Sequence, residues 1–254
     1  MSSNSIQLAS TPATNALTHA RLQIHHGGRG VAARRAVTAS LLLVLAGCAA
    51  TVTGHQEPGA AARHASDLNT VLLTPEEVDT SIAAAGVQID TTQSTLVDDS
   101  PYTTPLTCLA VSSMGQEHVY DRTQWTSARM QSMHEPGDSY AHLVHQAVVE
   151  LPDAGAANAF YARSARDWAA CAPGRYTYSA EADQDAAVWD VGPVADLNHV
   201  LTATITESDS DDWSCQRALT TSLNVVVDVL SCSATPAQSA ATVAQKIAAK
   251  ITDD

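Results

Sequence analysis

WSCQRALTTSLNVVVDVLSC, residues 213–232, is the stretch from which the architecture of this 254-residue chain follows. It predicts two β-strands joined by a polar tip at residues 221–224, because β-branched valines are concentrated in its second half. Cys215 lies near the start of the first strand and Cys232 near the end of the second. A hairpin that turns near Leu223 brings the two cysteines together, so the spacing predicts a disulfide between them.

An amphipathic helix is predicted directly after this hairpin, over Thr235–Ile251. Thr235 is suited to the N-cap and Pro236 to the first helical position. Apolar residues then recur at helical spacing, namely Ala240, Val243, Ala244, Ile247, Ala248 and Ile251. The end of the chain is therefore predicted to be a hairpin followed by a packing helix.

The motif C-Q-R-A-L at residues 215–219 is followed by N-V-V-V-D-V at 224–229, by Cys232 and by a helix that ends in I-A-A-K-I. This combination resembles the PknH-like extracellular sensor domains of mycobacterial Ser/Thr kinases, a domain that recurs in free-standing mycobacterial lipoproteins. The W-x-x-C motif at Trp168–Cys171 is a second point of similarity. The resemblance is most specific over residues 151–251 and implies a sensor domain with a ligand-binding cleft.

The sequence in front of Cys48 is typical of an export signal. Val31-Ala-Ala-Arg-Arg is a short basic region, and residues 36–46 form an apolar region that is too short to span a bilayer. Leu45-Ala46-Gly47-Cys48 matches the bacterial lipobox and predicts diacylglyceryl transfer to the Cys48 thiol, hence a lipid anchor on the extracytoplasmic face of the cell membrane. An ordinary secretory signal is the alternative.

These features predict three parts of the chain. Residues 1–47 are a signal peptide with a long N-terminal extension, whose start is either Met1 or Val31. Residues 48–70 have no hydrophobic period and are expected to be a flexible tether. Residues 71–254 are the sensor domain, which is long and apolar enough to form a single core.

The acidic residues are distributed unevenly. All 27 lie after Cys48, together with nine of the 13 basic residues, which gives that part a formal charge of −18. The charge argues against nucleic acid or an anionic bilayer surface as a partner. It suits either a cationic partner or simple solubility outside the cell. We expect a monomer that binds a small molecule or a component of the cell envelope.

Four cysteines remain after Cys48 is set aside: Cys108, Cys171, Cys215 and Cys232. An even number in an exported chain predicts two disulfides, with three pairings open. The hairpin favours Cys215–Cys232, which leaves Cys108–Cys171, and the family resemblance implies the same pairing. A zinc site is the alternative, but no C-x-x-C or H-x-x-x-H spacing supports it, so no metal site is predicted.

The rest of the chain predicts an α+β fold with a single antiparallel β-sheet of about five to seven strands, packing helices and two disulfides. Short strands in close succession favour antiparallel pairing over βαβ units. The clearest helix covers Asp153–Cys171, with one face made of Ala157, Phe160, Tyr161, Ser164, Trp168 and Cys171. A shorter helix is expected to start at Thr74, with a capping box to Glu77, and to end by Gly86.

Catalytic signatures are absent from the sequence. It contains no G-x-S-x-G, H-E-x-x-H, Walker or dinucleotide motif, so no catalytic residue and no cofactor is predicted. His142 and His145 are expected on opposite faces of a strand, which argues against a shared metal. The acidic run Asp209–Asp212 is predicted to be a solvated hairpin tip. A non-catalytic binding or sensor module is favoured; an envelope hydrolase with a dispersed active site and a structural lipoprotein are the alternatives.

Strand register predicts a specific polar pair. If Cys215 faces Cys232, Arg217 faces Leu230 and Leu219 faces Asp228, so Arg217 and Asp228 are diagonal neighbours on one face. We predict an ion pair between them, beside the disulfide and with Asn224 nearby, on the less buried face of the sheet. That face is the candidate binding surface. The opposite face, with Ala218, Val225, Val227 and Val229, is expected to be the core side.

Overall fold

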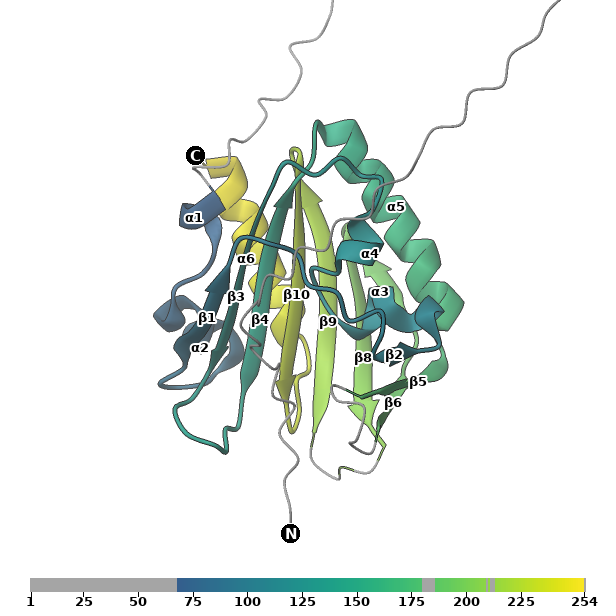
Figure 1. Cartoon of the computed structure of the whole chain (residues 1–254). Helices are drawn as coiled ribbons and strands as arrows, with labels where there is room; N and C mark the ends of the chain where they lie inside the picture. The colour runs from purple at the N-terminus through teal and green to yellow at the C-terminus, as the bar shows by residue number, and fades with distance from the viewer. Residues whose placement is uncertain (1–67, 180–185, 209, 211–212, 254) are drawn as a thin grey trace, which may run out of the picture. The chain divides into compact units, whose positions relative to one another are not determined.

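The structure is a computed structural model that describes residues 68–179, 186–208, 210 and 213–253 (Figure 1). The predicted signal peptide, Cys48 and the tether up to residue 67 lie outside these residues. Residues 68–70, predicted to belong to the tether, are instead part of a helix, because Leu68 packs into the core. So do Asp209, Asp211 and Asp212 of the predicted hairpin tip. No helix in the described part is long and apolar enough to cross a membrane.

A single antiparallel sheet lies at the centre of the described residues, which confirms the predicted fold class (Figure 1). The described part of the chain contributes ten strands, more than expected, in the spatial order β1-β3-β4-β10-β9-β8-β6-β5-β2, with β7 paired to β8. The strands are β1 (Gln88–Gln93), β2 (Thr103–Thr104), β3 (Ser127–His134), β4 (Leu143–Glu150), β5 (Gly174–Tyr178), β6 (Ala187–Val191), β7 (Ala195–Leu197), β8 (Val200–Glu207), β9 (Ser214–Ser222) and β10 (Val225–Ser233). Strands β2 and β7 have only two and three residues, too few to give an alternating pattern in the sequence.

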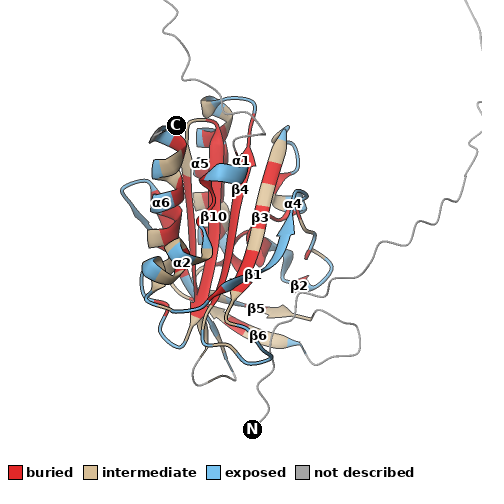
Figure 2. Ribbon diagram, turned by 90° about the vertical axis from the view of Figure 1, so that its left-hand side faces the viewer, coloured by how far each residue is buried: buried red, intermediate tan, exposed pale blue. Residues whose placement is uncertain are grey.

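Helices cover both faces of the sheet (Figures 1 and 2). On one face lie α1 (Leu68–Val71), α2 (Pro75–Ile82) and α6 (Ser239–Asp253). On the other lie η1 (Leu106–Cys108), α3 (Leu109–Ser112), α4 (Glu117–Tyr120) and α5 (Ala154–Cys171). All eight residues of β4 are therefore buried, although they alternate between the two faces.

The central hairpin has the predicted register. Cys215 pairs with Cys232, Arg217 with Leu230 and Leu219 with Asp228. Both disulfides form in the predicted pairing, Cys215–Cys232 and Cys108–Cys171. The valines of β10 that were predicted to face the core pack with α6, as does Ala218.

The two clearest helices differ in how well their starts were predicted. Helix α5 begins after the N-cap Asp153, and its buried residues are the six predicted. Helix α6 begins at Ser239 rather than after Thr235. Ala237 has a left-handed backbone with φ of 42°, so residues 237–238 form a turn before the helix. The side chain of Gln216, from β9, then accepts the Ala241 N–H at 3.1 Å and satisfies a free amide of the first turn.

Helix α2 has the predicted capping box between Thr74 and Glu77. It ends at Ile82, however, because Ala83 has a left-handed backbone with φ of 57°. Gly86 lies beyond the helix, where its N–H donates to the Asp79 carboxylate at 2.7 Å. The expected glycine therefore fixes the loop after the helix and does not end the helix itself.

Candidate functional site

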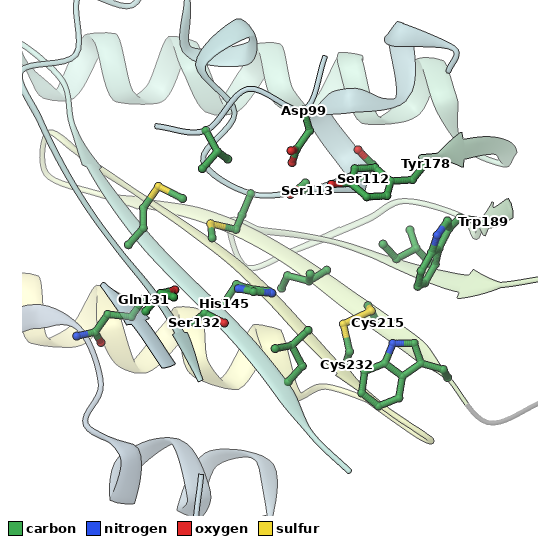
Figure 3. A pocket seen from close by; sticks show the side chains of 18 of the residues that line it. Asp99, Ser112, Ser113, Gln131, Ser132, His145, Tyr178, Trp189, Cys215 and Cys232 are labelled. Carbon is green, nitrogen blue, oxygen red and sulfur yellow. A yellow bond between two sulfur atoms is a disulfide. The ribbon is translucent and has the colours of Figure 1, made fainter. Parts of the chain in front are cut away.

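A pocket lies on the α5 side of the sheet, beneath the segment that carries Asp99 and α3 (Figure 3). Its floor is supplied by eight of the described strands, namely β1, β3, β4, β5, β6, β8, β9 and β10. Its roof is supplied by residues 97–99 and 112–114. Its cavity volume, counted as room for the centres of water-sized spheres, is about 80 Å³, enough for several water molecules. We call this pocket the cleft.

The floor of the cleft is largely apolar. It includes the rings of Tyr176 and Trp213. Trp189 and the Cys215–Cys232 disulfide belong to it as well (Figure 3). The Tyr140 ring packs edge-on against Trp213, with 6.0 Å between the two ring centroids. An apolar surface with aromatic rings and a few polar groups is the usual composition of small-molecule sites.

Asp99 is the acidic residue of the roof. Its carboxylate accepts a hydrogen bond from Gln116 Nε2 at 2.7 Å, and its own N–H donates to Gln116 Oε1 at 2.8 Å. Burial raises the pKa of Asp99, and hydrogen bonding by Gln116 and Ser113 opposes the rise. Gln116 therefore holds the carboxylate in place above the cleft.

His145 projects from β4 into the cleft (Figure 3). The residue is 6% exposed, and among the described residues none forms a hydrogen bond with its ring. Burial, together with the positive charge of Arg217, lowers the pKa of His145 to about 4. The imidazole is therefore neutral at pH 7, with one ring nitrogen a donor and the other an acceptor.

Arg217 and Asp228 form the predicted ion pair, with 2.7 Å between Arg217 Nη2 and Asp228 Oδ1. The prediction that they lie on a less buried face is wrong, because their side chains are 0% and 4% exposed. Helices α3 and α5 cover this face, and the Arg217 guanidinium lies 5.1 Å from the Trp168 ring centre. It also donates to the carbonyl groups of Val111, Ser113 and Val229. The pair is therefore part of the core and cannot be a binding surface.

The second carboxylate oxygen of Asp228 connects the sheet to the roof. It accepts the Gly115 N–H at 3.0 Å and the Tyr120 hydroxyl at 3.4 Å. Gly115 has φ of +62°, a left-handed backbone that favours glycine, and a Cβ there would lie 2.6 Å from Cε of Met130, so the end of Met130 would have to move. Burial, with the nearby Asp228 carboxylate, raises the pKa of Tyr120 and keeps its hydroxyl protonated. The ion pair thus fixes the residues directly after α3 above the floor.

Asn224 does not join the predicted surface either. It lies in the β9–β10 turn, is buried, and donates from Nδ2 to the Leu151 carbonyl at 2.9 Å. A longer contact of 3.4 Å reaches Glu150 Oε1. None of Arg217, Asn224 and Asp228 lines the cleft. Asn224 therefore ties the β9–β10 turn to the residue that follows β4 and serves the fold.

The residues that do line the cleft were not predicted as a site. Asp99, His145 and Trp189 come from segments far apart in the chain. One signal was present for His145, because it alternates in phase with Leu143, Ala147 and Val149. The four residues share the α5 side of the sheet, as the alternation indicates. A histidine in an otherwise apolar row that faces the core indicates either a side chain that lines a cavity or one that has a hydrogen-bond partner.

The cleft contains serine, histidine and aspartate side chains, but they are not arranged as a catalytic triad. A triad needs the imidazole between the hydroxyl and the carboxylate. In the described residues no hydrogen bond joins His145 to Asp99, Ser112 or Ser113. Over the same residues, no group of three or more His, Cys, Asp or Glu side chains could hold a metal ion.

A model of the PknH-like extracellular domain family matches residues 63–250. The chain belongs to this family. The kinase PknH of Mycobacterium bovis and of Mycobacterium tuberculosis is 34% identical over 185 residues, which are 72% of this chain. They are 30% and 29% of the two kinases, so the chain spans less than a third of their length.

A solved structure is similar as well. The crystal structure of the extracellular domain of PknH from Mycobacterium tuberculosis matches with a TM-score of 0.73 at 29% identity, over 77% of this chain and all of that one. The suspected relationship is thereby confirmed, and the described residues form a PknH-like extracellular domain. The similarity is to an extracellular domain and does not involve a kinase catalytic domain.

Proposed function

We propose that this PknH-like domain is an extracytoplasmic binding module whose cleft takes a small molecule or a component of the cell envelope without converting it. The cleft carries the proposal: an apolar floor lies beneath a roof that supplies a few polar groups. The roof is fixed to the floor by the Asp228 contacts with Gly115 and Tyr120. A preformed cleft of this kind binds without the cost of ordering its walls.

The hydrolase alternative has less support. A general base is effective when its pKa is near the working pH, and the pKa of His145 is about 4. The Asp99 carboxylate is held by Gln116 and does not orient the imidazole. These features favour recognition over catalysis.

Filling the cleft tests the proposal. Thr91 lines the cleft from the edge strand β1, whereas Thr92 is also exposed but does not line it. After incubation with a lipid extract of mycobacterial envelope, wild type and Thr92→Trp are expected to retain a stoichiometric ligand. Thr91→Trp is expected to retain about tenfold less, because an indole would occupy the opening. Mass spectrometry of the gel-filtered protein measures the retained ligand.

Two results would count against this function. Equal retention by all three proteins would place the ligand elsewhere, and steady conversion of an extract component would favour the hydrolase.

We also propose that the domain is held at the membrane by a lipid on Cys48. The lipobox Leu45-Ala46-Gly47-Cys48 and membership in an extracellular domain family support this. Cys48→Ala is expected to abolish lipidation, because the thiol is the acceptor, and to leave the protein unprocessed or free of the membrane. Mass spectrometry of the mature N-terminus measures the result. A wild-type N-terminus at another residue, without acyl chains, would overturn the anchor.

A further inference from the structure

His145 stands apart from the other polar groups of the cleft. Asp99 is bonded to Gln116, whereas no described residue forms a hydrogen bond with the His145 ring. Its ring nitrogens are not among the fully buried side-chain atoms without a partner in the described residues, so they are open to the cleft and bond to whatever occupies it. His145 as a residue is 6% exposed and lines the cleft, which lets an occupant reach the ring (Figure 3).

The surrounding charges restrict the chemistry of that occupant. Arg217 lies on the same side of the sheet as the cleft, and its positive charge acts on the imidazole. It disfavours an ammonium group beside the ring. Asp99 in the roof, when ionised, repels a carboxylate or phosphate that enters the cleft. An uncharged group that both donates and accepts a hydrogen bond is repelled neither by Arg217 nor by Asp99.

We propose that His145 is the polar anchor of the cleft and binds the hydroxyl group of an uncharged amphiphile. The apolar part of that molecule lies on the floor formed by Tyr176, Trp189 and the Cys215–Cys232 disulfide. A hydroxyl matches a neutral imidazole because each group offers one donor and an acceptor. This inference rests on the proposed function of the cleft and adds the chemical class of the ligand.

Three probes with the same chain and different head groups test it: 1-octanol, octanoate and octylamine at pH 7.5. Titration calorimetry with the wild-type domain is expected to show 1-octanol binding at least about tenfold more tightly than the two ions, since an unpaired buried charge costs more than a hydrogen bond. Thr91→Trp is expected to weaken 1-octanol binding, which places the probe in the cleft. Equal or tighter binding of either ion would overturn the proposal.

Variants of His145 separate the anchor from the apolar floor. His145→Leu removes the ring nitrogens and is expected to weaken 1-octanol binding about tenfold, the worth of one hydrogen bond. His145→Gln keeps a donor and an acceptor and is expected to recover part of the loss. His142→Leu is the matched control, because His142 precedes the same strand and does not line the cleft. Unchanged 1-octanol binding by His145→Leu would overturn the proposal.

The outcomes of these experiments distinguish a wrong ligand class from a wrong binding site. If none of the probes binds but an envelope ligand is retained by wild type and lost in Thr91→Trp, the ligand class is wrong and the cleft remains the binding site. If no envelope ligand is retained either, the proposed function fails together with the inference.

Discussion

Replacing Arg217 by methionine is expected to lower the free energy of unfolding by about 3–5 kcal/mol, the usual result of removing one partner of a buried ion pair. The change leaves the Asp228 carboxylate buried without its cation. It also removes the donor to four backbone carbonyl groups, those of Ala110, Val111, Ser113 and Val229. Urea denaturation at pH 7, followed by circular dichroism, measures the loss.

Arg175→Met is the matched control. Arg175 also pairs with a carboxylate across neighbouring strands, at 2.7 Å from Asp190, but the two side chains are 62% and 46% exposed. Exposed pairs contribute little to stability, so this variant should be nearly as stable as wild type. An Arg217→Met protein no less stable than Arg175→Met would show that the buried pair does not hold the roof to the sheet.

Acid is expected to destabilise the domain through His145. The folded pKa of about 4 lies below the ordinary value of 6.5, so the unfolded chain binds more protons between these two values. Stability is therefore complete above about pH 6.5 and falls as the pH is lowered toward 4. The loss attributable to this histidine between pH 7 and pH 4 is about 3 kcal/mol, at about 1.36 kcal/mol for each pH unit.

His145→Gln tests this prediction, because glutamine does not titrate. The difference between unfolding free energies at pH 7 and pH 4 is expected to be about 3 kcal/mol smaller in the variant than in wild type. His118→Gln is the control, because it removes an exposed histidine. It measures how much an exposed histidine contributes to the loss of stability in acid. If His145→Gln and wild type lose equal stability in acid, the ring is not held neutral by its surroundings.

Sequence patterns predicted the parts of this fold that depend on neighbouring residues. The register of β9 and β10 follows from a short turn and two cysteines. The Arg217–Asp228 contact could therefore be predicted from the sequence alone. The buried face of α5 follows from helical periodicity alone. The start of α6 was missed because the Ala241 amide of its first turn is satisfied by Gln216, from a strand, and not by an adjacent cap.

The cleft depends on a different kind of information. Its roof is a stretch of short helices and turns around residues 97–114, and nothing periodic in that stretch shows that it lies over the sheet. The same covering explains the error about Arg217 and Asp228. Charged residues in a strand indicate a solvent-exposed surface only when no other segment covers them. Here α3 and α5 cover both residues.

The two ends of the described domain lie on the side of the sheet that faces away from the cleft. Leu68 and Val71 of α1 share one apolar cluster with Ile251 of α6, and Lys250 Nζ donates to the Leu72 carbonyl at 3.3 Å. A fusion partner, an affinity tag or a sensor chip joined at either end would therefore leave the cleft unobstructed. The domain is in this sense a transferable module: the same cleft can be carried by different proteins without rebuilding its walls.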